Sequence, residues 1–399
     1  MSTRSAIEMH MKKIHYINFY LNQKEIEGRK LEVAAQSKIL YIMESLLKAG
    51  FKVDVVSTAY TMDGMGFSPK KEIIISPEER HIYLPSMSSK KIIKKFKKAF
   101  MQVQLFLYLF KKVKKDEIVL AYHSLAYMPI LKLFKKLRNV KFILEVNDLY
   151  ALHYTELKKI TNIKNKECNF FNLADGFLFA SPFMIELVKD RKPSIISYGS
   201  YKVFPIKNRI NDGRIHVIYS GVIENLRKAA KLVTNAAIYL PEDYVIHIAG
   251  YGTEANLKEI VSLCNQINKI KGYTAIKYHG LLLGTEFNNL LDNCTIAVNC
   301  HSYSNEDLWK SKYSFPSKIP LNMGHNLYLV SYNMPLILES PFAKFATFFN
   351  EFTPEAIANA IINCSAKIKN KDTHRIPIDL IRELDYAFVK SLKDLFTNI

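Results

Sequence analysis

The chain has 399 residues, of which 49% are hydrophobic and 23% charged, and its formal net charge is +19. This composition is typical of a folded protein, and the length fits two ordinary domains. The longest uncharged apolar stretch, residues 99–110, is shorter than the roughly 20 residues that a membrane-spanning helix needs. The first residues lack the apolar core of an export signal, so we expect a cytoplasmic protein.

The cysteine and carboxylate patterns argue against the common metal sites. The cysteines are scattered without CxxC or Cys/His spacing, and no Asp-x-Asp pair occurs. We therefore expect reduced, mostly buried thiols and neither a metal ion nor another cofactor.

The positive charge is concentrated in two segments. Residues 88–117 contain ten Lys against one Asp and one Glu, and residues 132–141 add five basic residues without an acid. Thirteen of the nineteen excess charges therefore fall in these segments, which indicates a basic patch rather than a general bias.

The first half alternates short β-rich runs with longer helical runs, as in parallel sheets with crossover helices. A helix is expected at 31–49, because apolar residues recur with helical spacing and Gly50 follows. The expected strands are residues 14–19, 52–57, 117–122, 141–146, 176–180 and 194–198.

The alternation restarts after a polar, irregular stretch. The expected strands there are residues 214–220, 244–250, 275–280, 295–299 and 327–331. Helices are expected from about residues 227 and 254 and at 354–367 and 378–396. We predict an N-terminal Rossmann-like domain at 1–200, a linker at 201–213, a second Rossmann-like domain at 214–377, and a C-terminal helix at 378–399 that could cross back to the first domain.

A basic amphipathic helix is predicted within residues 90–115. Its apolar stripe would be Ile92, Phe96, Ala99, Val103, Leu107 and Phe110. The lysines assigned to a membrane contact at its two ends are Lys90, Lys91, Lys94, Lys95, Lys97, Lys98, Lys111 and Lys112. Each lysine contributes about 1 kcal/mol against an anionic leaflet, which favours reversible docking on a membrane surface.

Two alternatives remain for this segment. It could be a solvated helix whose apolar face packs on its own sheet, as most charge runs are. Nucleic-acid binding is the other alternative. We expect no nucleic-acid partner, because no helix-turn-helix, RRM-like or zinc signature is present.

In the second half, three loops that follow strands carry residues suited to a diphosphate. Gly221 ends one strand, and Arg227 and Lys228 follow at the start of a helix, where cations and free amides attract anions. Gly250 and Gly252 allow a close backbone approach to a ligand. Ser317 and Lys318 lie in a predicted first helical turn, where a lysine opposes the helix dipole unless an anion binds.

In the first half, the candidates for catalysis also follow strands. Asn147 and Asp148 come directly after residues 141–146, and His123 comes after 117–122. Gly28 and Arg29, in the loop after the first strand, are assigned to the acceptor.

The order of these motifs resembles the GT-B glycosyltransferases, and among them the family-4-like group. Between residues 214 and 331 the chain reads IHVIYSGVI, Arg227-Lys228, IAGYG, YHGLL, CTIAVNC, FPSKI and LYLVS. The resemblance implies an α/β fold of two Rossmann-like domains facing across a cleft. The donor would bind the second domain and the acceptor the first, and the transfer would need no metal.

The resemblance also implies roles for single residues. Lys228 matches the lysine that grips the donor diphosphate, Gly250 and Gly252 match glycines near the donor, and Ser317 and Lys318 match the phosphate-facing helix start. Asn147 and Asp148 occupy the loop where many relatives carry a catalytic His.

The chain departs from the family pattern at three positions. Val222 stands where an arginine is common, so Arg227 could substitute for it. Tyr313 and Leu321 stand at the positions of two paired glutamates, the second of which usually holds the donor ribose. Ribose recognition must therefore differ from that of the family.

These observations predict a glycosyltransferase that moves a sugar from a nucleotide-diphosphate donor to a saccharide acceptor, with retention. The basic patch favours a lipid-linked acceptor at the inner face of a bacterial membrane, in the synthesis of capsule, O-antigen or another surface polysaccharide. Two alternatives stay open: a catalytically degenerate GT-B module that binds membranes, and a GT-B sugar-nucleotide epimerase.

Overall fold

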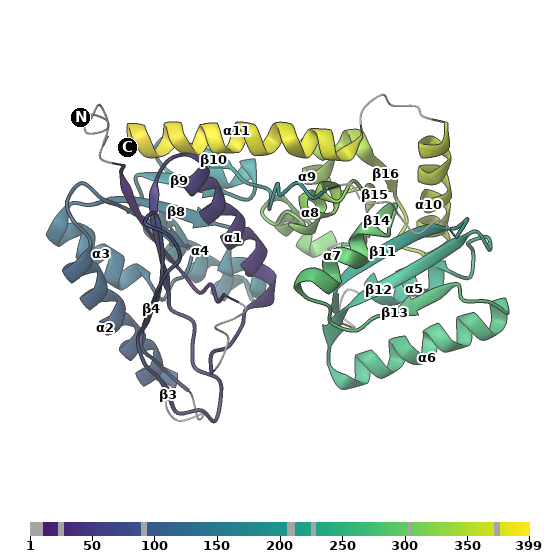
Figure 1. Cartoon of the computed structure of the whole chain (residues 1–399), viewed down its shortest axis with the longest axis horizontal. Coiled ribbons are helices and arrows are strands. Elements are labelled where there is room, and N and C mark those ends of the chain that lie inside the picture. The colour runs from purple at the N-terminus through teal and green to yellow at the C-terminus, as the bar shows by residue number, and fades with distance from the viewer. Residues whose placement is uncertain are drawn as a thin grey trace, which may run out of the picture. The chain divides into compact units, whose positions relative to one another are not determined.

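The computed structural model describes residues 11–22, 28–88, 94–205, 212–224, 229–301, 305–370 and 376–399. Contacts divide the chain into two compact units, residues 1–200 with 386–399 and residues 201–385. Each unit is built on its own parallel sheet with helices on both faces (Figure 1).

The first unit contains an eight-stranded sheet in the order β10-β9-β8-β7-β1-β2-β5-β4. Neighbouring strands are parallel except β4 and β5, which are antiparallel. The strands are β1 (Lys13–Asn18), β2 (Lys52–Ser57), β4 (Lys71–Ile74), β5 (Glu79–Tyr83), β7 (Ile118–Tyr122), β8 (Lys141–Val146), β9 (Gly176–Phe179) and β10 (Ser194–Ile196). The central strands are almost wholly buried, as expected where helices cover both faces of a parallel sheet.

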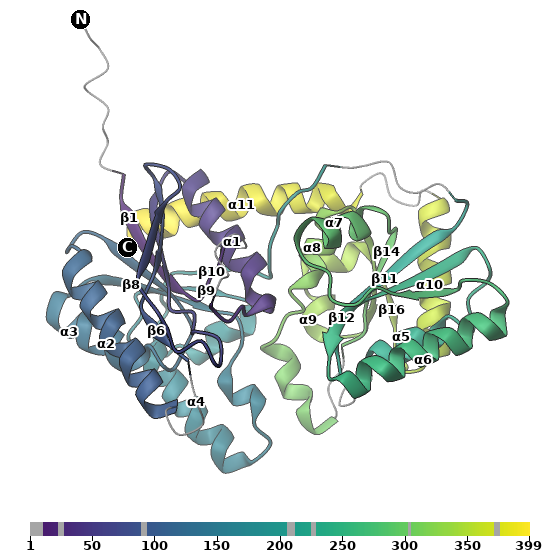
Figure 2. The same cartoon turned by 60° about the horizontal axis from the view of Figure 1, so that its bottom comes forward.

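The helices of the first unit are α1 (Val33–Lys48), α2 (Lys94–Lys112), α3 (Met128–Arg138) and α4 (Leu157–Phe171), with 3-10 turns η3 (Tyr150–His153) and η4 (Pro182–Leu187). A short antiparallel pair, β3 (Phe67–Ser68) with β6 (Ser86–Met87), stands apart from the main sheet. Figures 1 and 2 show α2 and α3 together on one side of the sheet and α1 on the other.

The second unit contains a six-stranded, all-parallel sheet in the order β13-β12-β11-β14-β15-β16. The strands are β11 (Ile215–Ile223), β12 (Tyr244–Gly252), β13 (Ile276–Tyr278), β14 (Ile296–Asn299), β15 (Tyr328–Tyr332) and β16 (Ala346–Phe349). Counted along the chain, this order is 3-2-1-4-5-6, the Rossmann arrangement.

The helices of the second unit are α5 (Ala229–Ala236), α6 (Glu254–Lys271), α7 (Gly284–Asp292), α8 (Lys318–Gly324), α9 (Pro335–Leu338) and α10 (Pro354–Lys369), with 3-10 turns η5 (Asn305–Lys312) and η6 (Pro341–Phe345). One core lies between the sheet and α5, α6 and α10, around Val233, Ile260 and Ile361. A smaller core on the other face joins Ile218 of β11 to Leu291 of α7.

A histidine ladder joins β11 and β12 of the second sheet to the residue that follows β13. His216 Nδ1 lies 2.8 Å from His247 Nε2, and His247 Nδ1 lies 2.9 Å from His279 Nε2. Asp212 accepts a hydrogen bond from His216 Nε2 at 3.0 Å. Burial and the neighbouring imidazoles lower the pKa of His247 to about 3, so the His247 imidazole is neutral at pH 7.

The last helix, α11 (Pro377–Asn398), contributes to both units, because the division falls between Asp385 and Tyr386. Within the first unit, the Phe388 ring stacks on Tyr41 with centroids 5.5 Å apart. In the described part of the chain, no helix combines the length and apolar character that crossing a membrane requires. The cysteines are free thiols, four of them buried and Cys168 half-buried.

The prediction of an α/β fold with two parallel, Rossmann-like sheets is confirmed. The strands that were predicted begin and end near the observed residues, but the sequence pattern missed β3, β4, β5, β6 and β16. The predicted helix start at about residue 227 lies outside the described residues, and α5 is described from Ala229.

Candidate functional site

A cavity of about 300 Å³ opens in the first unit at the carboxyl ends of four neighbouring parallel strands. Its walls come from the segments that follow β1, β2, β7 and β8, together with Lys30, Glu32 and Met101. The order of the sheet reverses at β1, between β2 and β7, and such a switch point is where open α/β sheets bind ligands.

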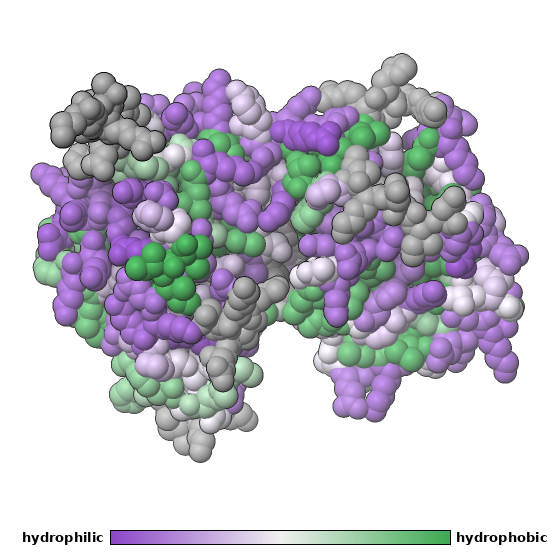
Figure 3. Space-filling view, viewed as in Figure 1, coloured by the Kyte–Doolittle hydropathy of each residue, from purple (hydrophilic) through white to green (hydrophobic). Residues whose placement is uncertain are grey.

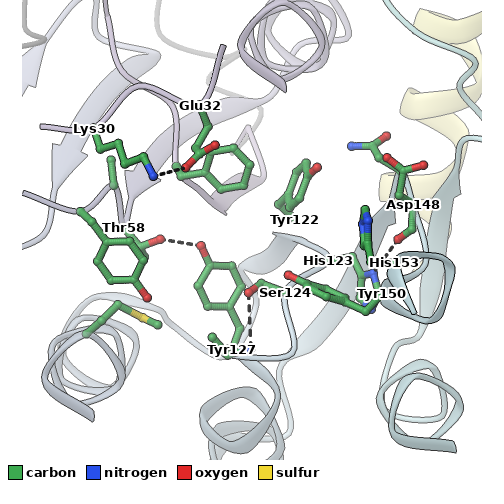
Figure 4. A pocket seen from close by; sticks show the side chains of 16 residues that line it. Lys30, Glu32, Thr58, Tyr122, His123, Ser124, Tyr127, Asp148, Tyr150 and His153 are labelled. Atoms are coloured by element: carbon green, nitrogen blue, oxygen red, sulfur yellow. Dashed lines mark hydrogen bonds and ion pairs between the residues drawn. The ribbon is translucent and has the colours of Figure 1, made fainter. Parts of the chain in front are cut away.

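The walls of this cavity are rich in aromatic rings. Figure 4 shows Tyr122, Tyr127 and Tyr150 around it, with Lys30 and Glu32 on one side and Asp148 and His153 on the other. Burial raises the pKa of Tyr122 and of Tyr127, so both hydroxyls stay protonated. Flat rings with polar tips suit a ligand that has both apolar faces and hydroxyl groups, as a sugar ring has.

Residues 147–153 form the wall that carries Asp148. His123 Nδ1 donates to the Asp148 carbonyl oxygen at 3.2 Å. Glu167 of α4 accepts hydrogen bonds from the backbone amides of Tyr150 at 2.7 Å and Ala151 at 3.2 Å. These contacts fix the backbone, while the Asp148 side chain itself is exposed at the cavity.

His123 and Glu167 are a buried support rather than an exposed catalytic pair. Burial lowers the pKa of His123 to about 4 and raises that of Glu167 to about 7. His123 Nε2 lies 3.6 Å from Glu167 Oε1 and has no hydrogen-bond partner among the described residues. The imidazole is therefore neutral at pH 7, and its described contacts orient the Asp148 segment.

A buried polar network supports Asn147. Tyr16 donates its hydroxyl hydrogen to Glu145, and Asn147 Nδ2 donates to Glu145 Oε1 at 2.6 Å. Burial raises the pKa of Glu145, an effect opposed by Lys38. Lys38 donates to the Ser197 carbonyl oxygen at 2.6 Å, and burial lowers its pKa to about 8. The cavity wall is thus preorganised by buried hydrogen bonds.

The residues assigned to the acceptor from the sequence do not line the cavity. Arg29 is buried and donates to the carbonyl oxygens of Ala59 at 3.0 Å and Pro69 at 2.9 Å. Gly28 has a φ of +77° and accepts from the Met62 amide at 2.9 Å. Lys30 and Glu32 are the residues of this loop that line the cavity. Gly28 and Arg29 shape the loop that supports them.

The glycines of the second unit serve strand packing. A Cβ atom on Gly250 would lie 2.0 Å from the Gly221 carbonyl oxygen, and one on Gly252 would lie 2.3 Å from that of Ile223. Gly221 pairs with Gly250 in the register of β11 and β12. The close approach that we expected toward a ligand is thus made by a neighbouring strand.

The predicted cations of the donor site lie only partly in the described chain. Arg227 and Lys228 fall outside the described residues. Ser317 precedes α8 without capping it through its side chain, and Lys318 is the first residue of α8. Lys318 has an exposed surface, yet partial desolvation by the surrounding protein atoms lowers the pKa of its ammonium group to about 8.

The three departures from the family pattern have defined places in the fold. Val222 is exposed on β11, and the Tyr313 ring lies 6.4 Å from that of Trp309. Leu321 packs against the core around Ile218. An apolar side chain in that position cannot accept a hydrogen bond from a ribose hydroxyl. In the described residues, no three His, Cys, Asp or Glu side chains converge as metal ligands.

Comparison of the sequence with protein-family models and with curated proteins gave no match. The structure resembles an alpha,alpha-trehalose-phosphate synthase (UDP-forming) from Burkholderia xenovorans in complex with glucose-6-phosphate. The TM-score is 0.64 at 10% identity, over 97% of this chain and 99% of that one. It also resembles HepE from Anabaena in complex with UDP, with a TM-score of 0.62 at 9% identity over 97% and 100% of the two chains.

A sucrose-phosphate synthase from Thermosynechococcus elongatus is similar too. Its TM-score is 0.61 at 14% identity, over 96% of this chain and 95% of that one. The chain has the GT-B glycosyltransferase fold. Because the identities are low, the likeness establishes the fold, and the fold alone leaves the substrates open.

The sequence pattern missed most of the residues that line the cavity. His123, Asn147 and Asp148 were identified, and the structure brings all three together at its wall. The rings of Phe19, Tyr60, Tyr122, Tyr127 and Tyr150 were not. The signal available was their position in the segments that follow strands, or at the last residue of a strand, in the first half of the chain.

Proposed function

We propose that the protein is a glycosyltransferase that moves a sugar from a nucleotide-diphosphate donor, held by the second unit, to a saccharide acceptor held in the cavity of the first. The observation that carries this proposal is the GT-B fold over nearly the whole chain, combined with an aromatic cavity at the switch point of the first sheet. Proteins of this fold include structures with UDP and with glucose-6-phosphate.

The donor diphosphate would contact Lys318, Lys228 and Arg227. We assign this contact to the cationic side chains, because α8 has seven residues and its dipole is short. As the bond between the sugar and the diphosphate breaks, negative charge develops on the leaving oxygen. Ammonium and guanidinium groups stabilise that charge, so the transfer would not require a metal ion.

The acceptor would lie between the tyrosine rings of the cavity. Asp148 would accept a hydrogen bond from the attacking hydroxyl and take its proton as the new glycosidic bond forms. Asn147 would orient a neighbouring hydroxyl while the buried Glu145 holds its amide in place. The resemblance to family-4-like enzymes supports retention of the anomeric configuration, so the hydroxyl would attack from the face of the sugar that the diphosphate leaves, with Asp148 on that same face.

The basic segments of the first unit support a lipid-linked acceptor. A cytoplasmic enzyme at the inner face of a bacterial membrane, acting in the synthesis of capsule, O-antigen or another surface polysaccharide, would meet such an acceptor. Clustered lysines attract the anionic lipids of that leaflet.

The test is nucleotide binding and sugar transfer with Lys228→Ala and Lys318→Ala combined. Loss of a charge-assisted hydrogen bond costs about 1.5–3 kcal/mol, so we expect at least a 100-fold weaker Kd for UDP by calorimetry. Release of nucleoside diphosphate from a nucleotide-sugar should fall in parallel. Lys158→Ala with Lys269→Ala removes two exposed lysines elsewhere and should change neither quantity. Unchanged UDP affinity in the first variant would refute the donor site.

A second candidate is a catalytically degenerate GT-B module. It is favoured by Leu321, whose apolar side chain packs against the core at the position where the family that the sequence resembles usually holds the ribose. Such a module would bind a nucleotide without turning over any nucleotide-sugar, so product formation over a panel of donors and acceptors separates the two functions.

A further inference from the structure

Helix α2 carries apolar side chains on two opposite faces. Its inner face, with Met101, Leu105 and Leu109, is buried. Its outer face exposes 73% of Phe96, 53% of Val103, 40% of Leu107 and 42% of Phe110. A surface helix of a soluble protein normally turns polar residues outward. The apolar stripe expected from the sequence is therefore the outward one, and a second stripe packs on the unit.

Helix α3 extends this outer face. Leu133 and Leu137, one helical turn apart, expose 44% and 54% of their side chains. The Arg138 guanidinium stacks over the Phe110 ring at 4.4 Å and donates to the Phe110 carbonyl oxygen at 3.3 Å, which joins the end of α3 to the end of α2. We call the exposed apolar residues Phe96, Val103, Leu107, Phe110, Leu133 and Leu137 the α2–α3 surface.

Hydrophobic atoms also reach solvent around this part of the unit. The lower left of Figure 3, where Figure 1 draws β3 and the start of α2, shows hydrophobic side chains at the surface. Phe67 of β3 is 53% exposed, and its ring lies 6.2 Å from that of Phe100 on α2. Contiguous exposed apolar residues of this kind mark interaction sites.

The charged residues of α2 and α3 are all positive. α2 contains six lysines and α3 contains three lysines and an arginine, and neither helix contains an acidic residue. Lys135 is paired with Asp175, whereas Lys98, Lys111, Lys112, Lys132 and Lys136 are exposed. An apolar stripe flanked by lysine ammonium groups is complementary to the acyl boundary and phosphates of an anionic bilayer.

The same helix borders the cavity. Met101 lines the cavity from the inner face of α2, and Gln102 Nε2 donates to the carbonyl oxygen of Ala126, another lining residue, at 2.8 Å. The Lys97 ammonium lies 4.2 Å from the centroid of the Tyr60 ring, which also lines the cavity. A surface to which α2 docks would therefore lie next to the wall of the acceptor cavity.

We propose that the α2–α3 surface docks on an anionic lipid bilayer, with its apolar side chains at the acyl boundary and its lysines on lipid phosphates. The inference rests on the proposed function for its purpose, because docking would bring the cavity to an acceptor anchored in that bilayer. A bilayer fits better than a protein partner, because the rim is cationic along both helices and a flat anionic surface neutralises all of it at once.

The first test is partitioning of the full chain onto vesicles in a flotation assay. We expect binding to vesicles of 70% phosphatidylcholine and 30% phosphatidylglycerol, weak binding to phosphatidylcholine alone, and release at 0.5 M salt. Each lysine removed should lower partitioning about fivefold. The charge variant combines Lys111→Gln, Lys112→Gln, Lys132→Gln and Lys136→Gln, so its partitioning should fall by more than 100-fold.

The matched control makes the same change of charge elsewhere. It combines Lys158→Gln, Lys164→Gln, Lys166→Gln and Lys269→Gln, all at exposed helical positions. Its partitioning should stay within a few-fold of the wild type. Equal losses in both variants would show that net charge, not this surface, governs binding, and would overturn the proposal.

The second test concerns the apolar stripe. Phe96→Ser, Val103→Ser and Leu107→Ser together should lower partitioning at least tenfold at constant charge. The variant lacks the apolar side chains whose transfer from water to the acyl boundary favours binding. The control Leu157→Ser, Val261→Ser and Ile270→Ser changes residues exposed to similar or greater extents. Thermal unfolding should be unchanged in both triple variants, since all six side chains already face solvent.

The outcomes separate this inference from the proposed function. Turnover of a nucleotide-sugar with a soluble acceptor, but no vesicle binding, would refute the docking surface alone. Vesicle binding without turnover would refute the transferase and leave the surface. The proposal is wrong if the wild type does not bind vesicles but self-associates in gel filtration, and if the apolar variant abolishes that self-association. The surface would then be a protein interface.

Discussion

The two sheets of this chain differ in the residues found at the carboxyl ends of their central strands. In the first unit, the ends of β1, β2, β7 and β8 are followed by aromatic and charged side chains that enclose a cavity. In the second, β11 and β12 continue to residues 223 and 252, and their glycines pack backbone against backbone.

This contrast shows that glycines resembling a ligand-binding motif can be explained by the packing of neighbouring strands. The second unit carries the glycines that resemble a donor site, and the strand pairing already accounts for Gly250 and Gly252. The first unit carries no such motif and yet builds its walls from four loops. A glycine indicates a close approach, but only the fold shows what approaches.

The largest effect should come from Asp148, an exposed carboxylate that lines the cavity in the first unit. Asp148→Asn keeps the shape but removes the proton acceptor, so kcat/KM should fall by about 10²–10⁴-fold. The melting temperature should hardly change, because the side chain is exposed.

Steady-state kinetics over a range of acceptor concentrations would measure this. Asp190→Asn changes an exposed aspartate outside the cavity lining and should retain full activity. If Asp148→Asn were as active as Asp190→Asn, the reaction would not use this wall of the cavity.

The next effect concerns the glycines of the second unit. Gly250→Ala would place a Cβ 2.0 Å from the Gly221 carbonyl oxygen, and backbone cannot yield as a flexible side chain can. We expect the free energy of unfolding of this unit to drop by about 3 kcal/mol or more, measured by denaturant titration.

Gly272 offers the comparison. It ends α6 with a φ of +74°, and a Cβ atom added there would meet no atom of the described residues within 4 Å. Asparagine tolerates that backbone conformation, so Gly272→Asn should cost less than about 1 kcal/mol. A stable Gly250→Ala protein that binds UDP poorly would instead support the interpretation of Gly250 as a ligand contact.

The smallest effect is a pH dependence specific to the second unit. The pKa of His247 is held near 3, below the ordinary value of about 6.5. As the pH falls, His247 is therefore protonated in the unfolded chain before it is protonated in the folded chain. The ladder's contribution to stability is complete above about pH 6.5 and is lost as the pH falls toward 3. At pH 5.5 this linkage costs about 1.4 kcal/mol.

His247→Leu removes the titrating group, so the difference in unfolding free energy between pH 7.5 and pH 5.5 should shrink by about that amount. The groups facing His247 are His279, His216, Lys277 and Arg214, which all disfavour its protonation. An identical pH dependence in wild type and variant would show that His247 carries no linked proton.

The fold followed from the sequence more completely than the site did. Continuous apolar runs such as 141–146 and helical spacing such as that of α1 are local signals, so the alternation of strands and helices could be read along the chain. Strands β4, β5 and β16 were missed, since their exposed or mixed patterns carry little local signal.

The site depends on contacts between distant segments. Asp148 was identified from its place after a strand, but Tyr60, Tyr127 and Lys30 come to line the same cavity only when four loops converge. Arg29 was assigned to the acceptor, and its burial against two carbonyl oxygens depends on segments 30 and 40 residues away. Such pairings carry no periodic signal in the chain.

The hydrogen bonds of the histidine ladder have a donor-to-acceptor direction. The His216 imidazole and the neighbouring Arg214 keep the pKa of Asp212 low, so its carboxylate can only accept, and His216 must donate to it through Nε2. When His216 carries its single proton on Nε2, its Nδ1 accepts from His247, and His247 Nδ1 accepts from His279. In that state one carboxylate sets the tautomer of three rings, and reversing any one of these hydrogen bonds would require all of them to reverse together.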